Sequence, residues 1–275
     1  MYKVIGCIVL YNNQMSEILN LIQEFYKENI NQKLVIVDNS EQTQLRDKIL
    51  KVNKNIEYIH SKNRGYVAAN NIVIKKYSGQ ADYYLVMNPE IFIKIEDLKE
   101  LISFADKIGE FGVIMPKVLY PDASNQYLCK MLPTPMNLIA RRFLVKFKNL
   151  VKKLDYNFEY RFSNYDKIME VPYLSGCFMF CNYRNLSREN GFDERYFIYL
   201  EDVDLSRRLY KYVNYFYPNV EIIHGFGKAS FKNIKMTLVH IKSAIRYFNK
   251  WGWFFDSERK YVNNEILTKY KKGRS

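Results

Sequence analysis

Three carboxylates stand within four positions of the stretch YFIYLEDVDL (196–205), directly after a run of aromatic and aliphatic side chains. If a helix begins near Leu200, these carboxylates occupy its first turn, where the helix dipole stabilises one or two of them. Three are more than capping requires. At about 100° per residue, Glu201 and Asp204 share one face, whereas Asp202 aligns with later leucines near the core side. The pattern predicts that Asp202 is a general base held at the rim of a pocket.

The tripeptide NPE follows the buried-strand pattern ADYYLVM and brings an amide and a carboxylate together. In extended chain Asn88 and Glu90 point to the same side, an arrangement that suits a hard cation bridging phosphate oxygens. The alternative is an ordinary strand exit, because Pro89 stops the strand. His224 closes the apolar run VEIIH and is either a satisfied structural residue or a metal ligand. No role is predicted for the other two histidines, His60 and His240.

Polar residues that suit a nucleotide follow the second and third strand patterns. Asp38 ends the apolar run of KLVIVDNS, where its carboxylate bonds a base or ribose, or caps the next helix through an Asx turn. Asn63 and Arg64 precede Gly65 at a helix start, where backbone N–H groups favour an anion. The chain contains neither GxGxxG nor GxxxxGKS/T, so the dinucleotide fingerprint and the P-loop are both excluded.

These residues need a scaffold, and the first 120 residues show strand and helix patterns in alternation. The expected strands are residues 4–11, 33–40, 56–60, 81–90 and 111–116. The expected helices are residues 16–26, 41–52, 63–77 and 95–107. Strands that alternate with helices pair in parallel through right-handed crossovers, and their ligands lie beyond the carboxyl ends. The polar residues just past strands two, three and four should therefore face one crevice.

After residue 120 the alternation is less regular, although no internal repeat or low-complexity segment appears. The expected elements are a basic amphipathic stretch near 136–154, strand-like sequence at 168–181, a short helix ending at Gly191, two short strands within 215–224 and a long helix near 231–250. A basic tail that contains Trp251 and Trp253 closes the chain.

Length and charge limit the class of function. The chain of 275 residues can bury a large core, and its formal charge of +13 attracts phosphate in nucleotides, nucleic acid or anionic lipid. The aromatic residues form no nucleic-acid recognition pattern, so no nucleic-acid partner is expected. The four cysteines fit no zinc pattern and are expected to be reduced and packed, which suits a cytoplasmic protein. The start, MYKVIGCIVLYNN, is too short for a signal peptide, and no run approaches the roughly 20 apolar residues of a membrane span.

Seven stretches, in order, resemble the family 2 glycosyltransferases of the GT-A fold, in their rhamnosyltransferase-like and galactofuranosyltransferase-like branch. They are IVLYNN, VIVDNS, NRGYVAANN, YLVMNPE, YLSGCFMF, GFDERYFIYLEDVDLSRRL and HGFGKAS, and they span about residues 3–230. The resemblance implies an α/β fold, Rossmann-like, with a mostly parallel sheet flanked by helices. It implies a catalytic domain over 1–230, divided into a nucleotide-binding half (1–120) and an acceptor half (121–230), followed by a basic helical extension over 231–275.

Carried onto this chain, the resemblance assigns roles to individual residues. It implies that Asp202 is the general base and that Glu201 and Asp204 support it. The nucleotide would contact Asp38, Asn63, Arg64 and Gly65. A divalent cation, Mg or Mn, would be held by Asn88, Glu90 and His224. The branch usually ends its metal motif in Asp, and Glu90 is one methylene longer, which still permits ligation.

The implied activity is inverting, metal-dependent transfer of a sugar from a nucleotide-diphosphate donor to a saccharide or lipid-linked saccharide, in bacterial surface polysaccharide synthesis such as that of capsule or O-antigen. The first donor expected is dTDP-rhamnose, with UDP-sugars as alternatives, and the oligomeric state is left open. The basic stretch ARRFLVKFKNLVKKL (140–154) and the Trp-containing tail suit contact with an anionic membrane at its inner face. A solvated helix face and a sugar-stacking wall are the alternatives for these segments. The competing function is a non-catalytic nucleotide- or polysaccharide-binding module of the same fold.

Overall fold

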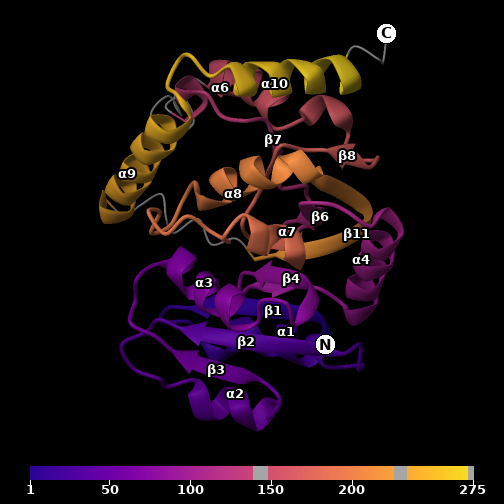
Figure 1. Ribbon diagram of the computed structural model, residues 1–275, viewed down its shortest axis with the longest axis vertical. Helices are drawn as coiled ribbons and strands as arrows, with labels where there is room; N and C mark the ends of the chain where they lie inside the picture. The colour runs from indigo at the N-terminus through magenta and orange to yellow at the C-terminus, as the bar shows by residue number, and fades with distance from the viewer. Residues whose placement is uncertain (139–147, 226–233, 272–275) are drawn as a thin grey trace.

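A mixed sheet covered by helices forms the centre of the computed structural model, which describes residues 1–138, 148–225 and 234–271 (Figure 1). The strands of the large sheet are β1 (Tyr2–Leu10), β2 (Gln32–Asp38), β3 (Glu57–His60), β4 (Ala81–Met87), β5 (Ile91–Phe92), β6 (Val113–Leu119), β8 (Met169–Glu170), β10 (Phe178–Asn182) and β11 (Tyr215–His224). They form a nine-stranded sheet in the order β3-β2-β1-β4-β10-β6-β11-β5, with β8 beside β11. A second, two-stranded sheet pairs β7 (Cys129–Lys130) with β9 (Tyr173–Leu174).

The described helices agree closely with the predicted ones. They are α1 (Met15–Phe25), α2 (Arg46–Val52), α3 (Tyr66–Lys76), α4 (Ile95–Ile108), α6 (Lys148–Phe158), α7 (Tyr183–Arg188), α8 (Glu201–Leu209), α9 (Ile234–Trp251) and α10 (Ser257–Tyr270), with 3-10 turns at η1 (Arg161–Ser163) and η2 (Tyr210–Tyr212). The largest difference in the first half is α2, which begins five residues later than predicted.

The first four strands, β1 to β4, pair in parallel, as the sequence predicts. Their helices cross over between strands, and α1 buries the predicted apolar face of Ile18, Leu21, Ile22 and Phe25. The register places Leu10, Asp38 and His60 side by side at the carboxyl ends of β1, β2 and β3. The carboxyl ends of these strands therefore form one edge of the sheet, where ligands of such sheets bind.

The second half of the sheet departs from the expected parallel order. β10 runs antiparallel to both β4 and β6, so the predicted fifth strand, β6, does not pair with β4. The two short strands expected within 215–224 are one strand, β11, and that prediction was wrong. The register of β11 on β6 shifts between Tyr217 and Glu221. Pro218 lies inside this shift. The regular pairing is interrupted there because proline has no N–H to donate to the hydrogen-bond ladder.

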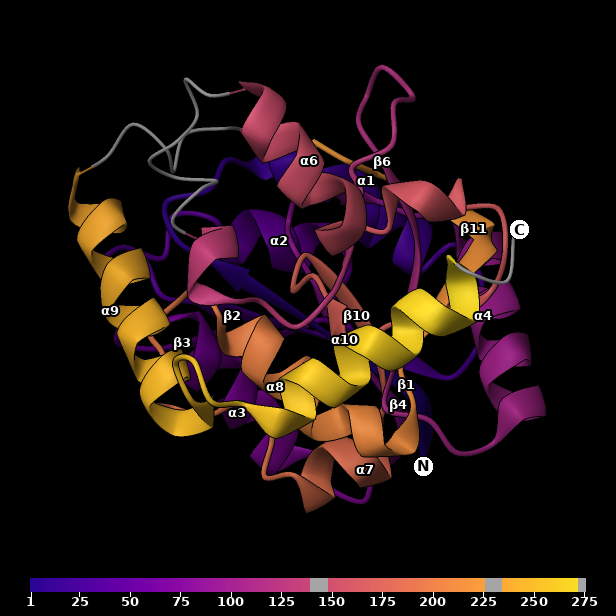
Figure 2. The same cartoon turned by 90° about the horizontal axis from the view of Figure 1, so that it is seen from above.

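The C-terminal helices α9 and α10 meet at an elbow and pack against the rest of the chain (Figures 1 and 2). Tyr247 and Phe248 of α9 and Ile266 of α10 belong to the buried core. The Asn263 side chain donates to the Leu132 carbonyl at 2.9 Å and accepts from its N–H at 3.0 Å. Apolar and polar contacts together fix these helices over α8.

Three predictions about the whole chain can be compared with the described residues. None of their helices is long and apolar enough to span a membrane. All four cysteines are free and buried, as expected. Much of the predicted basic stretch (139–147) and of the HGFGKAS motif (226–233) lies outside the described residues.

Candidate active site

Asp202 lies in the first turn of α8, and the prediction that this helix begins near Leu200 is confirmed. Leu200 has a φ of 60°, a left-handed conformation that turns the chain into the helix. The Asp202 carboxylate accepts hydrogen bonds from the Gly176 N–H at 3.0 Å and the Val203 N–H at 2.9 Å. The Tyr173 hydroxyl is 3.4 Å from the same carboxylate. These donors fix the orientation of a half-buried carboxylate.

A short segment before β10 joins Asp202 to the end of β4. Gly176 holds the Asp202 carboxylate, and the next residue, Cys177, accepts a hydrogen bond from the Asn88 N–H at 2.9 Å. A Cβ on Gly176 would lie 3.1 Å from the Asp202 Cβ, so glycine permits the close approach of α8. The antiparallel placement of β10 therefore brings the candidate base to the same edge as the candidate metal ligands.

Asn88, Glu90 and His224 contact one another at this edge. The His224 Nε2 lies 3.1 Å from the Glu90 Oε1, and the Asn88 Nδ2 lies 3.3 Å from each of those two atoms. Burial acts to raise the pKa of Glu90, but hydrogen bonds from His224, from its own backbone and from Asn88 outweigh burial and lower it. Glu90 is thus favoured as a carboxylate.

The tautomer of His224 follows from its second neighbour, Gln126. The Gln126 amide nitrogen donates to the carbonyls of Leu119 at 3.1 Å and His224 at 2.9 Å, so its Oε1 faces the imidazole. That oxygen is 3.0 Å from Nδ1 and can only accept, which places a proton on Nδ1. Nε2 faces the Glu90 Oε1 and the Asn88 Nδ2.

This donor set fits a divalent cation. An imidazole nitrogen and a carboxylate oxygen are ligands of Mg or Mn, and a hydrogen-bonded second nitrogen is the usual support of a metal-binding histidine. The Asn88 amide faces both groups with its nitrogen, so it would turn its oxygen toward a cation that these residues held. Among the described residues there is no group of three or more His, Cys, Asp or Glu side chains placed around a common point, so Asn88 is needed to complete the set.

A cavity of about 360 Å³ unites the candidate base with this cluster. Asn88, Glu201, Asp202 and His224 all line it. Glu90 is not part of the lining and reaches the cavity through its contact with His224. Residues that are more than 110 positions apart in the chain therefore line the same cavity.

Burial governs the acid–base behaviour of the two carboxylates at the start of α8. Glu201 is 6% exposed, and its Oε2 has no hydrogen-bond partner among the described residues. Burial, and then the charge of Asp202, raise the pKa of Glu201 well above its ordinary value. Burial also raises the pKa of Asp202, although the Gly176 N–H and the Lys130 charge oppose the rise. The pair favours a protonated Glu201 beside a basic Asp202 carboxylate.

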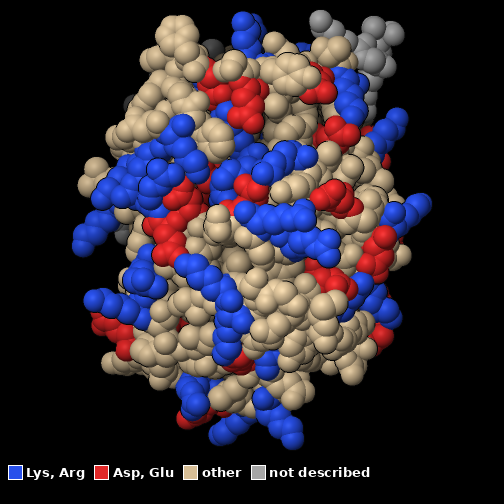
Figure 3. Space-filling model, viewed as in Figure 1, with Lys and Arg blue, Asp and Glu red and all other residues tan. Residues whose placement is uncertain are grey.

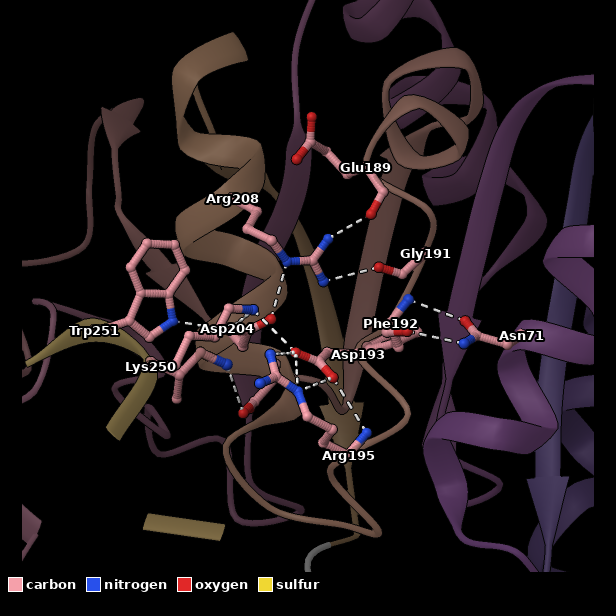
Figure 4. A network of polar contacts seen from close by, with 12 residues as sticks. Asn71, Glu189, Gly191, Phe192, Asp193, Arg195, Asp204, Arg208, Lys250 and Trp251 are labelled. Atoms are coloured by element: carbon pink, nitrogen blue, oxygen red, sulfur yellow. Dashed lines mark hydrogen bonds and ion pairs between the residues drawn. The ribbon is translucent and has the colours of Figure 1, made fainter. Parts of the chain in front are cut away.

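Asp204 does not line the cavity, and it joins α8 to α9 (Figure 4). It is fully buried, and its Oδ2 accepts from the Arg208 Nε at 2.9 Å, as the predicted shared helix face requires. Its Oδ1 lies 2.8 Å from the Trp251 Nε1 and 2.6 Å from the Lys250 Nζ. Any support that Asp204 lends to Asp202 therefore acts through the position of α8.

None of the four candidate nucleotide residues lines this cavity. Asp38 is buried, accepts from the Ser40 N–H at 2.8 Å and is bonded by the Tyr58 hydroxyl. This is the Asx turn that the sequence offered as an alternative to nucleotide binding. The His60 Nε2 lies 2.8 Å from the Ser40 carbonyl oxygen and steadies the same turn.

Asn63 and Arg64 are exposed, whereas Gly65 is buried. The Asn63 side chain accepts from the Gly65 N–H at 3.0 Å. Gly65 has a φ of 101°, and a Cβ there would lie 2.4 Å from the Phe197 carbonyl oxygen. Glycine is needed here because the start of α3 crosses the segment before α8, where the Tyr66 N–H donates to Phe197 at 2.9 Å.

Three further lining residues had no role in the sequence analysis. Lys130 and Tyr173 are partners on the two-residue strands β7 and β9, which are too short for periodicity to reveal. His240 lies on α9 with its ring 5.2 Å from that of Tyr199. The sequence could have indicated this position, because His240 is seven residues before the apolar Tyr247 and both therefore lie on one face of the helix.

The parallel first half, the antiparallel β10 and the shared cavity define the GT-A architecture, and solved structures agree. The chain aligns with GalNAc-T7 in complex with UDP, GalNAc and Mn2+ at a TM-score of 0.61 and 12% identity, over 82% of this chain and 43% of that chain. It aligns with S. aureus TarS 1-349 in complex with UDP-GlcNAc at a TM-score of 0.58 and 15% identity, over 98% of this chain and 71% of that chain. The mannosyltransferase PcManGT from Pyrobaculum calidifontis, with GDP-Man and Mn2+, aligns with a TM-score of 0.56 at 13% identity over 89% of this chain and 64% of that chain. The predicted fold class is confirmed.

The chain belongs to glycosyl transferase family 2, whose model matches residues 7–169. It is 28% identical over 252 residues to Rhamnosyltransferase WbbL of Escherichia coli K12, covering 86% of this chain and 87% of that protein. It is 27% identical over 146 residues to the N-acetylglucosaminyl-diphospho-decaprenol L-rhamnosyltransferase of Mycobacterium tuberculosis H37Rv, covering 52% of this chain and 47% of that protein. The chain is therefore a glycosyltransferase similar to rhamnosyltransferases.

Proposed function

We propose that this glycosyltransferase is inverting and metal-dependent. It moves a sugar from a nucleotide-diphosphate donor to a saccharide or lipid-linked saccharide in bacterial surface polysaccharide synthesis, at the cytoplasmic face of the membrane. The observation that carries the proposal is that Asp202, Asn88 and His224 line one cavity. The relatives named as rhamnosyltransferases support dTDP-rhamnose as the first donor to test, and the neighbours solved with UDP or UDP-GlcNAc support UDP-sugars as the second.

Asp202 is the general base of this proposal. Its raised pKa brings the carboxylate closer to the basicity that proton abstraction from a sugar hydroxyl requires. The Gly176 and Val203 N–H groups hold it in one orientation, so an acceptor in the cavity meets a fixed base. As the hydroxyl oxygen bonds to the anomeric carbon, its proton passes to Asp202 and the bond to the nucleoside diphosphate breaks. A single displacement of this kind inverts the anomeric centre.

Asn88, Glu90 and His224 would hold the cation, Mg or Mn. When bound, such a cation neutralises the negative charge that develops on a diphosphate leaving group. The chain itself supplies the tautomer of His224, fixed by Gln126, and the ionised state of Glu90. Gln126 and Asn88 thereby hold these groups at the part of the cavity that Asn88 and His224 line.

The remaining residues assist donor and base. Asp38, Asn63, Arg64 and Gly65 form the proposed nucleotide side, at the edge where the parallel strands end. Glu201, when protonated, adds no second charge beside the base, and Asp204 fixes α8.

Consumption of dTDP-rhamnose and UDP-sugars, measured with and without Mn, tests the proposal. Asp202→Asn should lower turnover by about 10²–10⁴-fold while donor binding, followed by thermal shift, persists. Asp122→Asn, in an exposed loop, is the matched control and should keep full activity. Turnover by Asp202→Asn within a few-fold of the parent would contradict the assigned base. Donor binding without any consumption by the parent chain would favour the non-catalytic module.

A further inference from the structure

The helix α9 has two different sides. Tyr247 is buried, and His240 lines the catalytic cavity. On the other side, Ile234, Leu238 and Ile245 are 79%, 61% and 43% exposed. Their spacing places them within about 40° of one another around the helix. An apolar stripe therefore faces outward on α9 from Ile234 to Ile245.

A row of cations borders this stripe. Lys235 and Lys242 are exposed, whereas Arg246 is half-buried and donates to the Arg195 carbonyl; the three lie within about 40° of one another on the adjoining strip of the helix. Figure 3 shows Lys and Arg side chains gathered over α9. An apolar stripe next to a cationic one is the pattern of a helix that lies in a lipid interface.

Exposed aromatic residues form a tip where α9 meets α10. Gly252, with a φ of 101°, turns the chain, and a Cβ there would lie 2.7 Å from the Phe255 carbonyl oxygen. The turn leaves Trp253 38%, Phe254 79% and Phe255 99% exposed. Asp256 then caps α10 by accepting from the Arg259 N–H, so the tip is anchored on both sides.

The two tail tryptophans have different surroundings. Trp251 donates to Asp204 and stacks on Arg207, whose Cζ lies 4.1 Å from the ring centroid. It is therefore committed to the interior contact between α9 and α8. The exposed aromatic residues are Trp253 and the two phenylalanines that follow it.

We propose that α9 and the aromatic tip dock this protein on an anionic lipid bilayer. We name the surface the docking face; it comprises Ile234, Leu238, Ile245, Trp253, Phe254 and Phe255 with Lys235, Lys242 and Arg246. The tip is convex, because a side chain that is 99% exposed, Phe255, has no surrounding groove. A bilayer accommodates a protruding aromatic side chain, whereas a protein partner would need a matching pocket.

Charge favours lipid over a second copy of the chain. Two copies packed through this face would bring like-charged rows together on a protein that already carries +13. An anionic bilayer neutralises the same row, and each lysine or arginine near such a surface contributes about fivefold in affinity. The charge complementarity thus selects phospholipid headgroups of net negative charge.

The docking face also explains where the cavity lies, and this step rests on the proposed function. His240 lines the cavity from the opposite side of α9, so one helix, about 10 Å across, separates the cavity from the lipid surface. A lipid-linked acceptor held in that surface would have a short path to Asp202.

Sedimentation of the full chain with vesicles tests the docking face. We expect binding to phosphatidylcholine vesicles that contain phosphatidylglycerol, weak binding to phosphatidylcholine alone, and loss of binding at high salt because the charges are screened. The double variant Phe254→Ser, Phe255→Ser should weaken binding at least tenfold, since each phenylalanine loses its apolar burial. Lys242→Glu should weaken it about 25-fold through two charge units, whereas Lys107→Glu on α4 makes the same change of net charge elsewhere and should leave it nearly unaltered.

Each variant must keep the melting temperature of the parent for its vesicle data to count. If the double phenylalanine variant unfolds, Lys242→Glu alone tests the docking face. Absence of binding to the anionic vesicles, or equal loss in Lys107→Glu and Lys242→Glu, would overturn the docking face. Self-association that the phenylalanine variant abolishes, without vesicle binding, would overturn it in favour of a second copy. Donor consumption is measured on the same samples: vesicle binding without consumption would reject the proposed function alone, and consumption without vesicle binding would reject the docking face alone.

Discussion

Replacing Asp256 by asparagine tests the buried ion pair that fixes α8, the helix of the candidate base, to the C-terminal helices. Two parallel bonds join the Arg207 guanidinium to the Asp256 carboxylate, at 2.8 and 2.7 Å, and the two side chains are 2% and 3% exposed. Asparagine keeps the size of the side chain and the cap of α10, because both residue types accept from the backbone at that position. The substitution therefore removes charge and little else.

The expected loss of stability is about 3 kcal/mol. Breaking a buried pair by removing one partner costs roughly 3–5 kcal/mol, because the other charge is left uncompensated. The low end applies because Glu258 still pairs with Arg207 at 2.6 Å and is itself 55% exposed. For a chain of this size, the loss corresponds to a fall in Tm of about 6–12 °C.

Urea unfolding followed by circular dichroism measures the change, and Glu258→Gln is the matched control. That control removes the exposed partner of the same arginine and should cost less than about 1 kcal/mol. The double variant Arg207→Met, Asp256→Asn should recover part of the loss, since it removes the Arg207 charge that Asp256→Asn leaves unpaired in the interior and keeps the cap of α10. If Asp256→Asn costs no more than Glu258→Gln, the buried pair does not hold α8 and the reasoning fails.

Three further changes act inside the cavity. Lys130→Met removes a charge that lowers the pKa of Asp202, so the acid limb of kcat/KM should move to higher pH; a limb that stays in place would refute the coupling. The pKa of Glu201 is raised in the folded state, so the parent loses stability as pH rises through that pKa. Glu201→Gln has no such loss, and its unfolding free energy should therefore increase relative to that of the parent above about pH 4.5. A difference in urea unfolding that does not change with pH would contradict this. Gly176→Ala adds a Cβ 3.1 Å from the Asp202 Cβ and should lower kcat about tenfold with the fold retained, whereas an unchanged kcat would show that the contact does not position the base.

Local pattern was sufficient for the first half of the fold. The strands from β1 to β4 and their helices follow from apolar runs and helical spacing, because each buries an apolar run or helix face whose periodicity is visible whichever element covers it. The position of β10 between β4 and β6 could not follow from pattern, since an apolar run does not specify its partners or its direction. The single strand β11 was predicted as two strands because Pro218 usually marks the end of a strand. Here Pro218 only interrupts the hydrogen-bond ladder between β11 and β6.

The meeting of Asn88, Glu90 and His224 was predicted from strand ends and from resemblance, and the contacts of the three side chains agree with it. The support of His224 by Gln126 was not predicted, because the two side chains meet only through the loop after β6. Gly65 shows the same limit. Its sequence position suggests an anion at a helix start, and its close approach to Phe197 depends on a segment more than 130 residues away.

The start of α8 shows how a basic chain accommodates three adjacent carboxylates. Asp204 is neutralised by Arg208 and Lys250, which come from its own helix and from α9. Burial favours the protonated form of Glu201, and only Asp202 keeps backbone donors that stabilise its charge at the cavity. The cluster therefore presents about one negative charge to the cavity, at a helix N-terminus that favours it. From helical spacing alone, all three side chains would be expected to be ionised. Their contacts with distant elements differ, and these contacts leave Asp202 as the carboxylate that is suited to take a proton.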